Sequence, residues 1–208
     1  MSSELPYLKE EEVRRRAAEF LLKHNPKGLI PTPIEKIIEF EFELDIIPVP
    51  GLMDCRGING YLSSDRTGIY VDDALLKGGR NRYFFTLAHD LAHYILHSAI
   101  YEELKTDRNW KEMREALSPS AYVTAEWQAD TFAGLVLVPP EKLKTALAKA
   151  FEELSARVLA RDKKFDLTGE AFWSYLAESI GKTFGVSPVT ARIRLENDNL
   201  WRRLPKGK

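Results

Sequence analysis

The segment Arg80–His97, with the sequence RNRYFFTLAHDLAHYILH, constrains this chain more than any other stretch. It contains three of the four histidines, and two of them, His89 and His93, are four residues apart. On an α-helix this spacing places both imidazoles on one face, one turn apart. The rest of the segment is apolar almost all round, which predicts a buried central helix. Both imidazoles then need partners, because an unpaired polar group is costly in a core.

A metal ion would satisfy both imidazoles. The sequence His-Asp-Leu-Ala-His from His89 to His93 has the spacing of the zinc-peptidase motif His-Glu-Xaa-Xaa-His, with Asp90 in place of the glutamate. We therefore predict that His89 and His93 bind zinc. The alternative is a pair of hydrogen-bonded core histidines. His97 is rotated away from the pair, and we expect it to support a ligand or to pack rather than to bind the metal.

A zinc site with two histidines from one helix needs a third protein ligand, which leaves the fourth position for water. Glu126 is the predicted third ligand. It lies near the start of a second helical segment, Thr124–Ala133, in which Asp130 follows one turn later on the same face. Asp130 would then accept the second N–H of a ligating histidine and orient its ring. The alternative is that both are ordinary carboxylates in the first turn of a helix.

Composition narrows the class of protein. With 208 residues, of which 44% are hydrophobic, the chain is long enough for one sizeable domain or one domain with a small appendage. The net charge of −1 gives no basic field, which disfavours direct nucleic-acid binding and membrane association. The first residues are polar, no apolar run reaches the length of a membrane span, and the single cysteine excludes an internal disulfide. We expect a cytoplasmic protein.

The pattern before the histidine segment predicts an α+β fold. Amphipathic helices are expected over Leu8–Lys23 and directly after Pro33. Residues 40–73 carry short apolar runs separated by turn residues, which predicts a small three-stranded antiparallel sheet. We expect this sheet to pack on a mostly helical body, and residues 1–140 to form the metal-binding domain.

Residues 141–208 predict a helical region that packs on this domain. A long charged helix over Glu141–Lys163 is followed by a helix-turn-helix pattern, in which Ser187 caps the last helix and Pro188 occupies its first turn. The pattern would suit a DNA-binding element. Acidic residues among its few basic ones disfavour DNA binding.

Two long motifs, Arg80–His97 and Glu126–Pro139, carry a resemblance to a known family. They resemble the corresponding segments of the ImmA/IrrE family of bacterial zincin-like metallopeptidases. The second segment follows the family pattern Glu-Xaa-Xaa-Ala-Asp/Asn-Xaa-Phe-Ala, with a later Leu-Xaa-Xaa-Pro. The resemblance extends from Pro33 to about Trp201 and implies a zincin-like minimal peptidase fold, whose C-terminal helices serve for packing or as a surface for the partner protein.

The resemblance also implies roles for individual residues. It assigns the zinc-ligand positions to His89, His93 and Glu126, and the general-base position to Asp90. Members of this family are paired with a helix-turn-helix repressor, which they cleave or inactivate under stress such as DNA damage. We expect the repressor to be a separate protein, because few residues precede the first catalytic-domain helices of this chain.

Aspartate at position 90 leaves two functions open. Aspartate is one methylene shorter than glutamate, so proton transfer requires the backbone or the water to shift by about 1 Å, which can cost about 10²-fold in rate. One function is a slow or selective zinc endopeptidase that acts on the repressor. The other is a non-catalytic, antitoxin-like zinc protein that regulates its partner by contact. Two nitrogens and a carboxylate would also suit manganese or iron.

Overall fold

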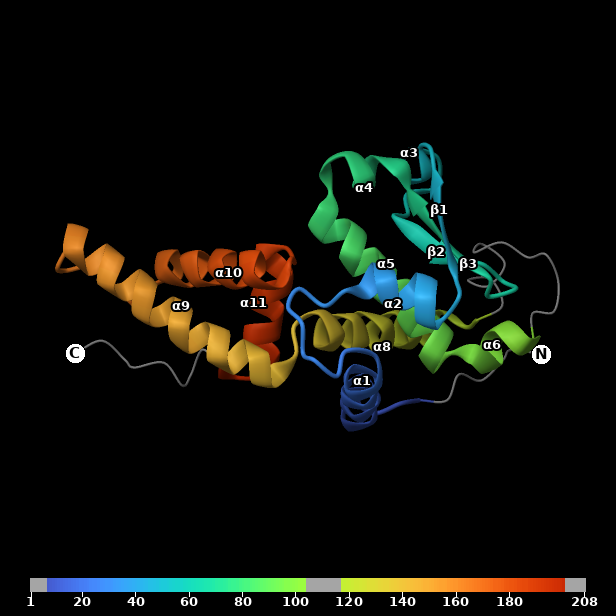
Figure 1. Cartoon of the computed structure of the whole chain (residues 1–208), viewed down its shortest axis with the longest axis horizontal. Helices are drawn as coiled ribbons and strands as arrows, with labels where there is room; N and C mark the ends of the chain where they lie inside the picture. The colour runs from blue at the N-terminus through green and yellow to red at the C-terminus, as the bar shows by residue number, and fades with distance from the viewer. Residues whose placement is uncertain (1–6, 104–116, 201–208) are drawn as a thin grey trace. The chain divides into compact units, whose positions relative to one another are not determined.

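The computed structural model describes residues 7–103 and 117–200, and its elements are labelled in Figure 1. The chain divides into two compact units, Met1–Val136 and Leu137–Lys208. The boundary that the sequence places after residue 140, and the packing of the C-terminal region on the first domain, stay predictions.

A three-stranded sheet lies in the first unit, with the strand order β1-β3-β2. Its strands are β1, Asp45–Val49; β2, Gly60–Leu62; and β3, Gly68–Asp72. β2 and β3 form an antiparallel pair, but β1 pairs with β3 in parallel, so that Asp45 lies opposite Gly68. The sheet is therefore mixed, and the prediction of a wholly antiparallel sheet was wrong.

The parallel pairing follows from the connection after β1. Instead of a hairpin, the chain forms a short helix, α3 (Leu52–Arg56), between Gly51 and Gly57. Both glycines have positive φ values, 67° and 70°, which residues with a Cβ rarely adopt. The chain then enters the β2–β3 hairpin, in which β3 becomes the central strand. A crossover connection of this kind joins parallel strands, whereas a tight hairpin joins antiparallel ones.

The central helix of the first unit is α5 (Arg80–Leu96), which confirms the helix predicted for the histidine segment. It packs against β2 and β3 and against two shorter helices, α2 (Ile34–Glu41) and α4 (Asp73–Gly78). Four of its residues have no exposed surface: Leu87, Ala88, Leu91 and Ala92. Burial of this apolar surface holds the helix in place and fixes the direction of its polar side chains.

Three further helices complete the described part of this unit: α1, Glu10–His24; α6, Ser98–Glu103; and α8, Pro119–Leu137. α8 buries a stripe of residues at helical spacing: Ala125, Gln128, Ala129, Phe132, Ala133 and Val136. Near its end, the Val136 carbonyl accepts a hydrogen bond of 2.8 Å from Thr32 Oγ1. This bond joins α8 to the segment that leads into α2.

The second unit is helical, with α9 at Pro140–Arg161, α10 at Glu170–Phe184 and α11 at Pro188–Asn197. Phe172 of α10 is fully buried and contacts Phe151 of α9 edge to face. Ser187 caps α11 by accepting a hydrogen bond from the Thr190 amide, which confirms the predicted cap. Together with the mixed sheet, this largely helical chain confirms the α+β class. Within the described ranges, no helix is both long and apolar enough to cross a membrane.

Candidate metal centre

Helix α5 brings the two histidines of the motif together. His89 and His93 lie one turn apart, and their Nε2 atoms are 3.1 Å from each other. His93 is only 5% exposed, and His89 is half-buried at the wall of a cavity of about 270 Å³. Both rings therefore direct their Nε2 atoms into one small space.

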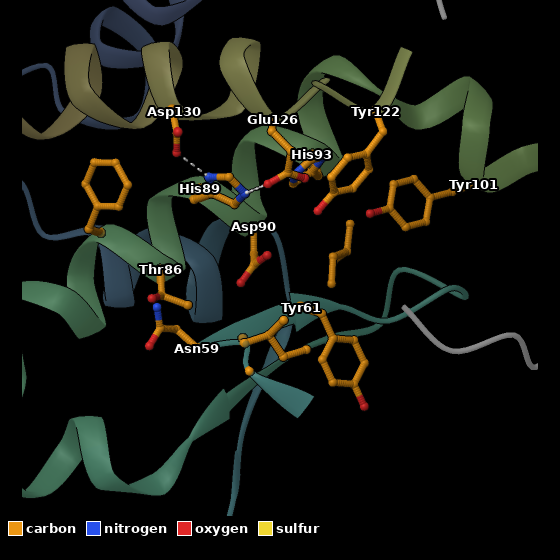
Figure 2. A pocket seen from close by; sticks show the side chains of 15 residues that line it. Asn59, Tyr61, Thr86, His89, Asp90, His93, Tyr101, Tyr122, Glu126 and Asp130 are labelled. Carbon is orange, nitrogen blue, oxygen red and sulfur yellow. Dashed lines mark hydrogen bonds and ion pairs between the residues drawn. The ribbon is translucent and has the colours of Figure 1, made fainter. Parts of the chain in front are cut away.

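Glu126 approaches the same space from α8, as Figure 2 shows. Its Oε2 atom is 3.5 Å from His89 Nε2, and its Oε1 atom is 3.5 Å from His93 Nε2. The three donor atoms of these residues lie within 4.8 Å of one another. Two imidazole nitrogens and one carboxylate form the donor set that catalytic zinc sites use, with a fourth position left open.

The electrostatics of this cluster fit a bound cation. Burial alone would raise the pKa of Glu126, but hydrogen bonds from His89 and His93 hold that pKa well below its usual range. Burial lowers the pKa of His89, yet hydrogen bonds to Asp130 and Glu126 outweigh it and raise the pKa to about 10. The surroundings thus favour one positive charge between these groups, which a proton or a divalent metal ion can provide. The residues present fit a metal ion.

Asp90 lies beside this cluster without belonging to it. Its side chain is 4% exposed and points into the cavity from α5 (Figure 2). Its Oδ2 atom is one of two buried side-chain oxygens without a hydrogen-bond partner in the described part of the chain; the other is Asn59 Oδ1, in the same cavity. Burial raises the pKa of Asp90 to about 7, and the nearby charge of Glu126 adds to this effect.

Gly60 allows β2 to approach Asp90 closely. A Cβ atom at this position would lie 2.9 Å from Asp90 Oδ2 and 2.6 Å from Thr86 Cγ2. Both contacts are shorter than van der Waals distance, so only glycine fits between the strand and the helix. β2, one of the two edge strands of the sheet, therefore lies close to the carboxylate of Asp90 at Gly60.

The two residues predicted to support the ligands contact different histidines. Asp130 Oδ1 is 2.9 Å from His89 Nδ1, so this carboxylate accepts the second N–H of His89. His97 Nδ1 is 3.0 Å from His93 Nδ1. Burial lowers the pKa of His97 to about 3, and the neighbouring His93 adds to this effect, so His97 remains neutral.

A comparison with models of known protein families shows which family the chain belongs to. The model described as the IrrE N-terminal-like domain, of the peptidase M78 type, matches residues 69–196. The chain belongs to this family. The match confirms the resemblance inferred from the two motifs, and it includes His89, His93, Glu126 and Asp90. No curated protein matches the chain.

Membership of the IrrE-like family implies a metallopeptidase-like protein and a metal ion. The group of donors that could hold this ion is His89, His93 and Glu126. Their individual roles, and the choice of zinc, stay predictions that the geometry supports.

Three residues of this IrrE-like domain were not anticipated from the sequence. Tyr101 and Tyr122 line the cavity, and both hydroxyls point into it (Figure 2). Tyr101 is 4% exposed, and burial raises the pKa of its hydroxyl well above the usual value, so it stays protonated. Gln128 is completely buried, and its Oε1 atom is 2.8 Å from His97 Nε2. The helical period of the buried stripe on α8 could have identified Gln128 as a buried polar residue.

Proposed function

We propose that this protein is a zinc-dependent endopeptidase that acts on a helix-turn-helix repressor-type regulatory protein. One observation carries the proposal: His89, His93 and Glu126 converge in a cavity that also contains the unpartnered carboxylate of Asp90. Membership of a metallopeptidase family supports the reaction class. The repressor as substrate rests on the family resemblance of the two motifs.

Three side chains would hold the metal ion through the Nε2 atoms of His89 and His93 and the carboxylate of Glu126. A bound zinc ion supplies Lewis-acid chemistry, since it polarises a peptide carbonyl and lowers the pKa of water to about 7. Two histidines and one carboxylate are a donor set of catalytic zinc, and membership of a metallopeptidase family supports zinc over manganese or iron.

Asp90 would move the proton in this reaction. Its side chain points into the cavity, and its buried Oδ2 atom has no protein partner, so the carboxylate is free to bind a water molecule or the leaving nitrogen of a peptide bond. A general base works best when its pKa lies near the working pH, and burial raises the pKa of Asp90 to about 7. Asp90 would accept a proton from water and deliver it to the leaving amine.

The walls of the cavity would position the substrate. β2 is the edge strand on the cavity side, and an extended peptide can add to such an edge through main-chain hydrogen bonds. Gly60 keeps this strand close to Asp90. The protonated hydroxyl of Tyr101 would donate a hydrogen bond to the carbonyl oxygen as that oxygen becomes negative.

One observation favours a second candidate function. Asp90 stands where the general zinc-peptidase motif has glutamate, and its side chain is one methylene shorter than the usual general base. A protein of this kind could retain zinc for structure and regulate a partner by contact alone. The two candidates differ in whether the partner is cleaved.

The test uses the zinc-loaded protein and a helix-turn-helix repressor encoded beside it. We expect intact-mass spectrometry to show cleavage at a discrete site, and Asp90→Asn to reduce the rate by about 10²- to 10⁴-fold. Asp90→Glu is the matched control, because it keeps the carboxylate. Binding without cleavage, equally tight for the native protein and Asp90→Asn, would establish the contact regulator instead. Neither binding nor cleavage would exclude this repressor as the partner.

A further inference from the structure

A buried chain of hydrogen bonds leads to His93 from the segment before α1. Gln128 Nε2 is 3.3 Å from the carbonyl oxygen of Leu8, and Gln128 Oε1 is 2.8 Å from His97 Nε2. His97 Nδ1 is in turn 3.0 Å from His93 Nδ1. Gln128, His97 and His93 are 0%, 1% and 5% exposed, so the two bonds among these side chains are shielded from water.

The Leu8 carbonyl sets the direction of every bond in this chain, because it can only accept. The NH₂ group of Gln128 must therefore face Leu8, which turns Oε1 towards His97. His97 then carries its proton on Nε2 and leaves Nδ1 as an acceptor. His93 donates from Nδ1, so its Nε2 atom keeps a lone pair.

The opposite direction would block the metal centre. If the amide of Gln128 rotated by half a turn, Oε1 would face the Leu8 oxygen, and two acceptors would repel each other. The NH₂ group would face His97, which would move the His97 proton to Nδ1 and make His93 Nδ1 an acceptor. The proton of His93 would then lie on Nε2, the atom that points at His89 and Glu126. Such a tautomer cannot bind a metal through that nitrogen.

We propose that Gln128 is a positioning residue, which acts through His97 to hold His93 in the tautomer that offers Nε2 to a metal ion. This inference rests on the proposed metal centre, since the metal gives the tautomer its consequence. A neutral histidine, His97, takes the place of the carboxylate or backbone carbonyl that usually orients a ligating histidine, and the buried amide of Gln128 fixes its tautomer. Because the relay starts at Leu8, it also joins the segment before α1 to the metal centre.

The test is Gln128→Met, which keeps the length of the side chain but removes its donor and acceptor. We expect zinc affinity, measured by chelator competition, to fall about 10- to 100-fold. We also expect long-range ¹H–¹⁵N spectra of the metal-free protein to show His93 protonated on Nδ1 in the native chain and on both nitrogens, in exchange, in the variant. With four histidines in the chain, these signals can be assigned by single substitutions.

Thr131→Val is the matched control, since it removes a hydroxyl from the same helix and should leave affinity and tautomer unchanged. Thermal unfolding of the metal-free variants identifies any loss of folding. Unchanged affinity and an unchanged His93 tautomer in folded Gln128→Met would overturn the inference while leaving the metal centre intact. If the native protein bound no zinc, the proposed function would fail, and the spectra would still decide whether Gln128 fixes the tautomer.

Discussion

His89 and His93 both direct Nε2 into the same cavity, but different kinds of partner bind the Nδ1 atoms of the two rings. His89 donates to Asp130, a carboxylate whose side chain is 60% exposed. His93 depends on His97 and Gln128, which are almost completely buried. Water can replace an exposed acceptor but cannot reach the buried one. The two ligands should therefore respond differently when their partners are changed.

The two supports also differ in charge. Hydrogen bonds to Asp130 and Glu126 overcome burial and raise the pKa of His89 to about 10. Burial lowers the pKa of His93, whose Nδ1 lies 3.0 Å from Nδ1 of the neutral His97. Positive charge is thus favoured at the His89 side, while the His93 side supplies a neutral lone pair. A histidine binds a metal ion only when it is neutral, so a metal ion would displace a proton from His89 and would use the lone pair that His93 already offers.

Removing the metal should have the largest effect on stability. In this test His89 and His93 should behave alike, because both bind one ion. A ligand that binds only the folded state stabilises it by about 4 kcal/mol when its concentration is about a thousand times Kd. We expect chelation to remove this stabilisation and so to lower the midpoint temperature of unfolding of the native protein. His89→Ala and His93→Ala should each lose this response in thermal unfolding with and without zinc. A response retained by either variant would contradict the shared centre.

Asp90 extends the comparison to a group with no hydrogen-bond partner on its buried oxygen. Burial raises the pKa of Asp90 to about 7 in the folded chain, above the ordinary value of 3.8. Its ionisation therefore destabilises the metal-free fold increasingly as the pH rises between these two values, and has no effect below them. Asp90→Asn should stabilise the metal-free protein by a few kcal/mol at about pH 8 and hardly at all near pH 4.

Denaturant unfolding of native protein and Asp90→Asn at the two pH values measures this difference. Bound zinc should reduce the stability that Asp90→Asn gains at the higher pH, because a cation beside Asp90 favours the ionised carboxylate. An equal change in stability at both pH values would show that Asp90 is not forced to ionise in a buried site.

Asp130→Asn tests the exposed support directly. We expect zinc affinity to fall only about tenfold, at the low end of the range for partners of metal ligands, because the new amide oxygen or water still accepts from His89. Chelator competition measures this, with Gln128→Met alongside. A larger loss for Asp130→Asn than for Gln128→Met would reverse the comparison between exposed and buried supports.

Ser187→Ala should have the smallest effect on stability. It tests whether a change in the second unit leaves the metal centre of the first unit unaffected. The Ser187 hydroxyl accepts a hydrogen bond of 3.0 Å from the Thr190 amide at the start of α11. Loss of a helix cap of this kind costs about 1 kcal/mol, which denaturant unfolding can detect. Zinc affinity should not change. A change would reveal coupling between the second unit and the metal centre.

The sequence predicts those features that depend on local spacing. The period of the apolar residues predicts α5, and the four-residue interval places His89 and His93 on one face. The direction of β1 could not be predicted in this way, because an apolar run has the same appearance in a parallel or an antiparallel pair. The path through α3 decides that direction.

The support of His93 also lies beyond local patterns. Gln128 acts because the carbonyl of Leu8, 120 positions away, faces its amide. Tyr101 follows α5 by a short turn, and only the packing of α6 brings its hydroxyl to the cavity. Such contacts depend on how distant segments meet, which spacing along the chain does not encode.

The most direct test of the central claim is elemental analysis of the protein purified without chelator, together with His93→Ala and Glu126→Ala. We predict one zinc per chain in the native protein and none in either variant, while both variants keep the helical circular dichroism of the native chain. No metal in the native protein, and none taken up when zinc is added, would contradict the centre formed by His89, His93 and Glu126. Full zinc content in both variants would contradict it equally.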